Sequence, residues 1–267
     1  MKRYRIKPGG KVNLGKLDAG DTAAAPKGKK ATEEVFTELN DRLDVLQEKL
    51  WAGHRHKVLV VLQGMDTSGK DGTISHVFEG VNPLGVRVAA FKAPSPEELD
   101  HDFLWRVHPR VPGSGEMVIF NRSHYEDVLA VRVLKLAPEE VWKARYQQIN
   151  DFERLLTDSG TVILKFFLHI DRDEQKKRLQ ERLDDPLKRW KFRLGDLKDR
   201  ALWDDYTAAY EDALEKTSTA DAPWYVVPAN KKWYRNLVVA TVLVDALEKL
   251  DLQPPESGED LSNVVIE

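Results

Sequence analysis

The residues best suited to chemistry lie in a glycine-rich segment, Gly-Met-Asp-Thr-Ser-Gly-Lys-Asp-Gly-Thr, at positions 64 to 73. Gly64, Gly69 and Lys70 have the spacing of a phosphate-binding loop, in which backbone N–H groups and the lysine surround phosphate at the start of a helix. A lysine in a first helical turn is unfavourable unless an anion meets it. We therefore predict phosphate binding, and the alternative is an ordinary turn with a solvated Lys70. The predicted binding residues are Gly64, Thr67, Ser68, Gly69, Lys70, Asp71, Gly72 and Thr73.

Two acidic residues in this segment depart from the usual pattern. Asp71 stands where Ser or Thr normally supplies a hydroxyl to magnesium, and Asp66 lies inside a loop that should attract anions. A carboxylate next to phosphate is repelled unless a cation lies between them. We predict that Asp66 holds Mg²⁺, or Mn²⁺ in its place, directly or through water. The alternative is that Asp66 accepts hydrogen bonds from neighbouring N–H groups and only braces the loop.

A second polar cluster, Asn121 to Asp127, follows the apolar run Met117 to Phe120. In a parallel sheet the carboxyl ends of the strands meet at one edge, so this cluster should lie near the glycine-rich segment. We predict that Asn121 and Arg122 bind phosphate, since a guanidinium can bind two phosphate oxygens. Glu126 and Asp127 are predicted to hold the metal or to orient the acceptor. His124 is expected to brace backbone, because an ionised phosphate acceptor needs little help from a base.

A basic segment from Arg172 to Arg193 holds nine Lys and Arg residues. Arg178 and Arg182 are four positions apart on a predicted helix and would share one face. We predict a lid over residues 172 to about 200, with Arg178 and Arg182 in catalysis and Lys188 and Arg189 binding phosphate or nucleotide. The alternative is a solvated surface, because acidic residues are interspersed. Candidates for stacking on a nucleotide base, or else for the core, are Trp190, Phe192 and Trp203.

The rest of the chain alternates between strand-like and helix-like patterns. The predicted strands are Val58 to Leu62, Val86 to Phe91, Met117 to Phe120, Val162 to Ile170 and Trp224 to Val227. The predicted helices include Thr32 to Trp51, Glu139 to Leu156, Asp204 to Leu214 and Trp233 to Leu250, and helix-start signals occur at Ser95 and Asp171. This alternation predicts one α/β domain over residues 32–250, with a mostly parallel, five-stranded sheet covered by helices on both faces.

Composition limits the class of protein. The 267 residues are 42% hydrophobic and include no cysteine, so the chain can bury a core but has no disulfide or thiolate metal site. A net charge of -3 with both signs mixed argues against nucleic-acid binding, and the lack of a long apolar run predicts a cytoplasmic protein without membrane contact. Residues 1–31 form a basic arm and residues 251–267 an acidic tail, and we expect both to be poorly ordered. The basic arm is either solvated, attracted to a polyanion, or part of an oligomer contact.

Three segments together resemble the family-2 polyphosphate kinases. They are residues 64–73, the sequence Asn-Arg-Ser-His-Tyr-Glu-Asp at 121–127 and the sequence Asp-Pro-Leu-Lys-Arg-Trp-Lys at 185–191, within a similarity over about residues 30–250. The resemblance implies a phosphate-loop kinase fold, magnesium dependence, inorganic polyphosphate as donor and a nucleotide as acceptor. Asn121 together with Glu126 is similar to the subgroup that phosphorylates both AMP and ADP, with guanine nucleotides left open. An exposed apolar helix face would support a homo-oligomer, either a dimer or a tetramer.

The resulting hypothesis is in-line phosphoryl transfer, with Mg²⁺ at Asp66 and with Lys70, Arg122, Arg178 and Arg182 neutralising the transferred group. Two rivals stay open. One is a nucleoside or nucleotide kinase that uses ATP as donor. The other is a nucleotide-binding regulatory switch, although the segment Asn230 to Trp233 begins like a guanine-reading motif and lacks its aspartate.

Overall fold

The computed structural model describes residues 1–26, 29–255, 258–259, 264 and 266, and it has an α/β fold. Five parallel strands form one sheet in the order β2-β3-β1-β4-β5. Their bounds are β1 (Lys57–Gln63), β2 (Val86–Ala90), β3 (Met117–Asn121), β4 (Thr161–His169) and β5 (Trp224–Pro228). The predicted parallel sheet of five strands is therefore confirmed, with every strand end within one residue of its expected position.

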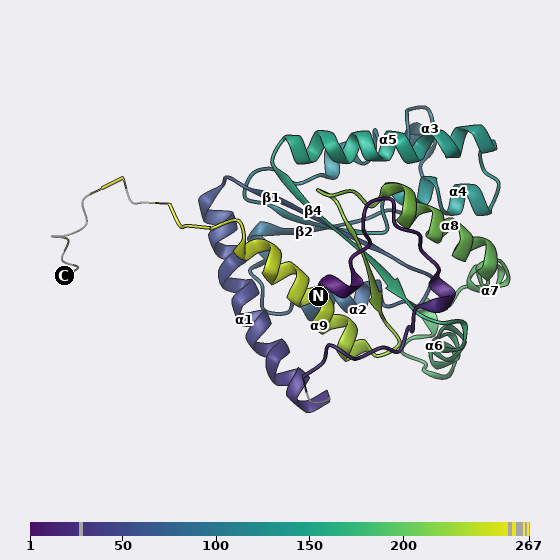
Figure 1. Ribbon diagram of the computed structural model, residues 1–267, viewed down its shortest axis with the longest axis horizontal. Coiled ribbons are helices and arrows are strands. Elements are labelled where there is room, and N and C mark those ends of the chain that lie inside the picture. Colours follow the sequence, from purple (N-terminus) through teal and green to yellow (C-terminus); the bar gives the residue numbers. More distant parts are fainter. Residues whose placement is uncertain (27–28, 256–257, 260–263, 265, 267) are drawn as a thin grey trace.

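Helices cover both faces of the sheet. They are α1 (Lys29–Gly53), α2 (Lys70–Val77), α3 (Pro96–Leu99), α4 (Ala130–Val133), α5 (Glu139–Asp158), α6 (Arg172–Asp184), α7 (Leu194–Ala201), α8 (Trp203–Thr217) and α9 (Lys232–Glu248). Short 3₁₀ helices span Lys2–Tyr4, Leu14–Lys16, Pro83–Gly85, His108–Arg110, His124–Asp127 and Arg189–Lys191. In Figure 1, α1, α2 and α9 lie on one side of the sheet, and α4, α5 and α8 lie on the other. Among the described helices, none is both long enough and apolar enough to span a bilayer.

Burial follows the strand order. Val58 to Leu62 of the central strand β1 are completely buried, because helices cover both of its faces and strands flank both of its edges. Strand β2 is less buried than β1. Strand β2 is at the edge of the sheet, and the side chain of Val88 is 49% exposed. The predicted cap at Asp171 is present, since its side chain accepts a hydrogen bond from the Glu174 N–H at 2.7 Å.

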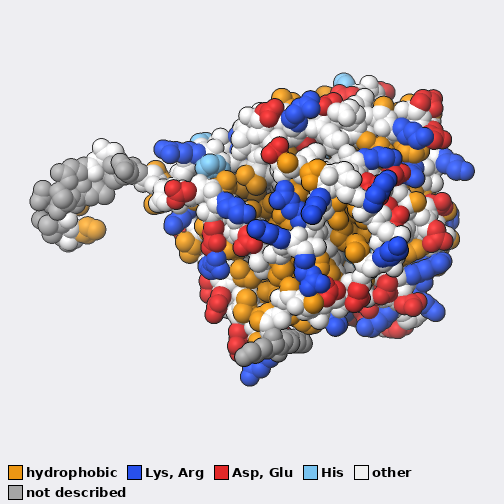
Figure 2. Space-filling view, in the orientation of Figure 1, with side chains coloured by type: hydrophobic (Ala, Val, Ile, Leu, Met, Phe, Trp, Pro, Cys, Tyr) orange, Lys and Arg blue, Asp and Glu red, His pale blue; other side chains and the backbone are white. Residues whose placement is uncertain are grey.

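The N-terminal segment is packed on the domain, so the expectation of a poorly ordered arm is wrong for residues 1–26. The Tyr4 hydroxyl lies 2.5 Å from that of Tyr234, and the Ile6 N–H donates to the Trp224 carbonyl at 2.8 Å. Apolar residues spaced between the lysines cause this docking, and Leu14 is only 3% exposed. Figure 2 shows Lys and Arg side chains on the surface at the centre of the face that this segment crosses in Figure 1. Much of the predicted acidic tail lies outside the described residues.

The packing of this segment can be tested with two of its leucines. We expect Leu14→Ala to lower the free energy of unfolding by about 2–4 kcal/mol, because it removes a buried side chain and leaves a cavity. Leu17→Ala is the matched control, since Leu17 is 41% exposed, and it should change stability by less than about 1 kcal/mol. Urea unfolding measures both. Equal effects of the two substitutions would mean that the segment is not docked in solution.

Candidate active site

The glycine-rich segment forms a tight loop between β1 and α2. Gly69 has a φ of 100° and caps α2, and a Cβ there would lie 2.0 Å from Nη1 of Arg235. A Cβ on Gly64, whose φ is 154°, would lie 2.8 Å from the Leu168 carbonyl oxygen. Both positions therefore require glycine. Thr67 also has a positive φ, 66°, which is unfavourable for a residue with a side chain and is typical of functional sites.

Lys70 folds back over this loop. Its Nζ donates to the Gly64 carbonyl at 2.7 Å and to the Met65 carbonyl at 3.3 Å. Burial, followed by the charge of Arg122, lowers the pKa of Lys70 to about 8. The hydroxyls of Thr67 and Ser68 are buried and have no hydrogen-bond partner among the described residues. Buried polar groups are normally paired, so these two hydroxyls and the lysine suit a loop that receives an anion.

Three of the predicted residues meet beside this loop. Arg122 Nη2 lies 2.7 Å from Asp66 Oδ1, and Arg122 Nη1 lies 3.8 Å from Glu126 Oε2. Burial opposes a charge on Arg122, but Glu126 and Asp66 outweigh burial and raise the pKa of its guanidinium. Glu126 also accepts a hydrogen bond from the Gln63 amide at 3.1 Å. Residues that follow β1 and β3 in the sequence thus lie close together, at the edge of the sheet where the carboxyl ends of these strands meet, as expected.

Asn121 and Asp127 have other partners. The Asn121 amide donates to Asp71 Oδ1 at 2.7 Å, which links the end of β3 to the first turn of α2. Asp127 was predicted to hold metal with Asp66 and Glu126, but its carboxylate binds Arg145 on α5 at 3.0 Å. Burial raises the pKa of Asp127 despite this arginine. The described part of the chain contains no group of three or more acidic or histidine side chains with metal-site geometry.

Arg178 has a different position from the one predicted. It is 5% exposed, and all five of its N–H groups have acceptors. Those acceptors are Glu174 Oε1 and the carbonyls of Thr67, Ser68, Ala229 and Asn230, at 2.6 to 3.1 Å. Arg182 does not share an anion with it, because Arg182 Nη1 lies 3.5 Å from Asp196. Arg178 therefore braces the loop from behind instead of offering free donors to phosphate.

The residues of the predicted lid form α6, α7 and the connection between them, and their action as a lid stays a prediction. In Figure 1, α6 and α7 lie together at one end of the molecule. Lys188 pairs with Asp185 at 2.6 Å, and Arg189 Nε donates to the Leu183 carbonyl at 3.1 Å. Trp190 is 75% exposed, whereas Trp203 packs partly against the core. The binding roles given to Lys188, Arg189, Trp190 and Phe192 stay predictions.

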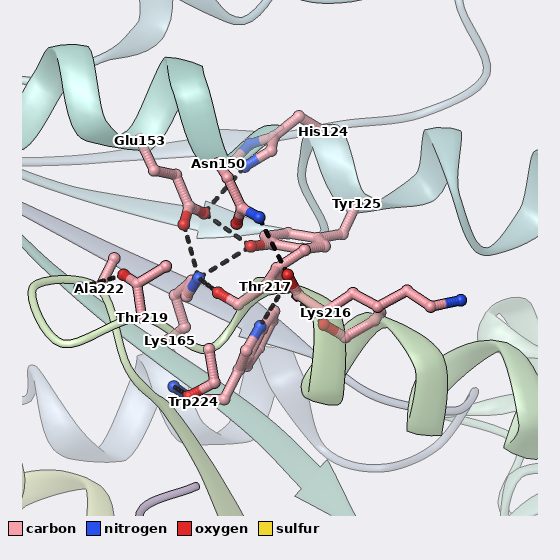
Figure 3. A network of polar contacts seen from close by, with 12 residues as sticks. His124, Tyr125, Asn150, Glu153, Lys165, Lys216, Thr217, Thr219, Ala222 and Trp224 are labelled. Carbon is pink, nitrogen blue, oxygen red and sulfur yellow. Dashed lines mark hydrogen bonds and ion pairs between the residues drawn. The ribbon is translucent and has the colours of Figure 1, made fainter. Parts of the chain in front are cut away.

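His124 and Tyr125 point into the core and join a buried polar network (Figure 3). His124 Nε2 lies 3.3 Å from Glu153, and the Tyr125 hydroxyl donates to Glu153 at 2.7 Å. Lys165 on β4 pairs with Glu153 at 2.5 Å and donates to the Tyr125 hydroxyl at 2.9 Å. The network thus fixes the segment that also carries Arg122. This agrees with a bracing role for His124.

The sequence reading missed Arg235, which lies against Gly69, and the acidic residues Asp196 and Asp199 of α7. Burial, and then the charge of Asp66, raises the pKa of both aspartates, which places them in the electrostatic range of the loop. One signal could have identified Arg235. It is a charged residue within the apolar stretch of α9, on a helix with eleven buried residues.

The chain is similar to known proteins over almost its whole length. A family described as "Polyphosphate kinase 2 (PPK2)" matches residues 27–255. An AMP/ADP-polyphosphate phosphotransferase from Meiothermus ruber is 60% identical over the full length of both chains, and an ADP-polyphosphate phosphotransferase from Rhodopseudomonas palustris is 44% identical over 96% of this chain and 92% of its own. The crystal structure of polyphosphate kinase 2 from Arthrobacter aurescens TC1 superimposes with a TM-score of 0.94 at 47% identity, covering 98% of this chain and 93% of that one. With this match over nearly the whole chain and the loop geometry described above, the protein belongs to the polyphosphate kinase 2 family and is a polyphosphate-dependent nucleotide phosphotransferase.

Proposed function

We propose that this enzyme transfers the terminal phosphate of inorganic polyphosphate to AMP and to ADP, and that it also catalyses the reverse reaction. The observation that carries the proposal is the pairing of Arg122 with Asp66 beside the loop of Lys70, at 2.7 Å. Lys70 and Arg122 are two cations beside one loop, which supports their joint use in binding a phosphoryl group. The name of the 60% identical relative supports both acceptors, as does the combination of Asn121 with Glu126.

The roles of the residues follow from their contacts. Lys70 and the N–H groups at the start of α2 bind the phosphate chain, because the first N–H groups of a helix have no acceptor within it. Arg122 exchanges its carboxylate partners for phosphate oxygens as charge develops on the transferred group. Arg178 holds the loop in shape through the carbonyls of Thr67 and Ser68. In-line transfer then needs positioning and neutralised charge more than it needs a base.

We also propose that magnesium, or manganese in its place, acts with this site. Asp66 and Glu126 would hold it, because carboxylate oxygens suit a hard cation and both lie near the loop. Asp127 is not included, since Arg145 binds it. When bound, the ion supplies positive charge to oxygens of donor and acceptor phosphates. Asp66 would be free to hold a cation once Arg122, which pairs with it at 2.7 Å, bound phosphate instead.

Product analysis tests the function. Long-chain polyphosphate is supplied with AMP or with ADP in the presence of magnesium, and the nucleotides are separated by ion-exchange chromatography. We expect ADP and ATP from AMP, and ATP from ADP. Phosphorylation of AMP with ATP as donor but not with polyphosphate would instead identify the ATP-dependent kinase. Retained nucleotide without transfer from either donor would identify the regulatory switch.

The compartment and the assembly complete the proposal. We infer a cytoplasmic enzyme, because its acceptors and products are intracellular nucleotides. We also infer a homo-oligomer, a dimer or a tetramer, whose subunit number light scattering coupled to size-exclusion chromatography would give.

A further inference from the structure

Arg235 is a buried cation without an acidic partner. It lies one turn into α9 and is 2% exposed. Its Nε and Nη2 both donate to Oδ1 of the neighbouring Asn236, at 3.0 and 2.7 Å. Among the described residues no carboxylate forms an ion pair with it, and the nearby charge that acts on it is that of another arginine, Arg178. A buried guanidinium without a counter-charge is costly, because burial removes water and nothing replaces it.

The unpaired end of this guanidinium faces the phosphate loop. A Cβ placed on Gly69 would lie 2.0 Å from Nη1 of Arg235, and one placed on Gly72 would lie 3.5 Å from Nη2. The guanidinium is therefore in contact with the turn from which α2 begins. Asn236 takes two of its five N–H groups, and Nη1 makes no hydrogen bond to a described residue.

The charges around Gly69 are unbalanced. Arg178 Nη1 lies 3.8 Å from the same Cβ position, but its charge is balanced by Glu174 at 2.7 Å. Arg122 is likewise paired with Asp66. Lys70 donates to the carbonyls of Gly64 and Met65 and is attracted by the charges of Asp66, Glu126 and Asp71. Arg235 has no such attraction, and burial together with the charge of Arg178 lowers the pKa of its guanidinium to about 9. Burial and the repulsion from Arg178 therefore disfavour the charged form of Arg235 in the free protein.

We propose that Arg235 is a positioning residue whose counter-charge is supplied by condensed phosphate at the loop, so that it stabilises the liganded protein more than the free one. The inference rests on the proposed function, since it requires that the loop binds phosphate. Arg235 positions the backbone of Gly69 and Gly72 and contributes its positive electrostatic potential to the loop, without touching the transferred group. A chain of phosphates brings more negative charge to the loop than a single phosphate does, and it therefore offsets the charge of Arg235 better.

The test compares the binding of tripolyphosphate to the full-length wild-type enzyme and to three variants by isothermal titration calorimetry. Arg235→Met removes the charge and keeps an unbranched side chain, whereas Arg235→Lys keeps the charge. Arg42→Met removes one exposed positive charge on α1, where Arg42 pairs with Glu248, and controls for the change in net charge. We expect binding to weaken by about tenfold in Arg235→Met and by less than about threefold in the other two.

Thermal unfolding gives a second readout that a packing role would not produce. Without ligand, the midpoint temperature of unfolding of Arg235→Met should equal or exceed that of the wild type. Tripolyphosphate should raise this midpoint temperature by less than half as much in the variant as in the wild type. The inference would be overturned if Arg235→Met had a lower midpoint temperature without ligand and the same rise in midpoint with tripolyphosphate as the wild type. Arg235 would then serve packing alone. If Arg235→Met does not fold, Arg235→Gln takes its place with the same limits. If wild-type enzyme does not bind tripolyphosphate, the proposed function itself fails, which is a separate result.

Discussion

Replacement of Lys70 by alanine is expected to lower the turnover of polyphosphate-dependent ATP formation by about a hundredfold to a thousandfold. Lys70 is 8% exposed at the loop, and its ammonium group is held by the carbonyls of Gly64 and Met65. Removal of one preorganised donor in a site from which water is excluded has an effect of that order in other enzymes. The fold should remain, because the ammonium group bonds only to two backbone carbonyls and forms no ion pair with a described carboxylate.

The control for this substitution is Lys57→Ala. Lys57 stands at the opposite end of β1, where its Nζ donates to the Ser159 carbonyl at 2.9 Å on the surface. Lys57→Ala removes the same type of side chain at a position away from the loop, and turnover should stay within about twofold of the wild type. Initial rates with saturating polyphosphate and ADP, with circular dichroism as a check on folding, measure both. Wild-type activity in Lys70→Ala would refute the assignment of the loop.

Replacement of Lys165 by methionine is expected to lower the free energy of unfolding by about 3–5 kcal/mol. Lys165 and Glu153 are 0% and 1% exposed, and their ion pair of 2.5 Å is surrounded by Tyr125, Thr217 and Trp224 (Figure 3). Without the ammonium group, Glu153 would be a buried carboxylate with only His124 and the Tyr125 hydroxyl as partners. The second substitution Glu153→Gln, added to Lys165→Met, should restore part of the loss, because it removes the unpaired charge.

An exposed ion pair provides the control. Lys143 and Glu139 are also 2.5 Å apart, but their side chains are 56% and 66% exposed. Lys143→Met should therefore change stability by less than about 1 kcal/mol, since water screens the pair. Guanidinium unfolding, followed by tryptophan fluorescence, measures all variants. A loss as small as that of Lys143→Met would show that the buried pair contributes little to the fold.

Low pH should reduce the contribution of Glu153 to the stability of the folded state. Burial favours the neutral form of Glu153, but Lys165 and His124 outweigh burial and hold its pKa below the usual value of 4.5. A carboxyl group with a lowered pKa stabilises the folded state above pH 4.5, and that contribution is lost as the pH falls below it. Glu153→Gln has no such group, so the difference in stability between wild type and variant should shrink on acidification.

Local patterns in the sequence were sufficient to predict the sheet and the loop. An apolar run of strand length, a glycine spacing and a following helix are all encoded within about twenty residues around Gly64, so neighbouring positions specify them without help from distant parts of the chain. The meeting of Asp66, Arg122 and Glu126 was also predictable, because parallel strands end at one edge of the sheet. The N-terminal segment was misjudged, since charge counts outweighed the few apolar residues, such as Leu14, that dock it.

Only the tertiary structure decided which charged side chains face the site. Arg178, Asp127 and His124 have residue types suited to catalysis, yet their partners, such as Thr67, Arg145 and Glu153, lie far away along the chain or on another element. A side chain's direction depends on the packing of such distant residues, which periodicity and spacing do not encode. The glycine-rich loop, its lysine and the parallel sheet were thus determined by the sequence itself. Arg178 and Arg235 lie behind that loop because α6 and α9 pack against it. Burial and charge pairing arise only once those helices are in place.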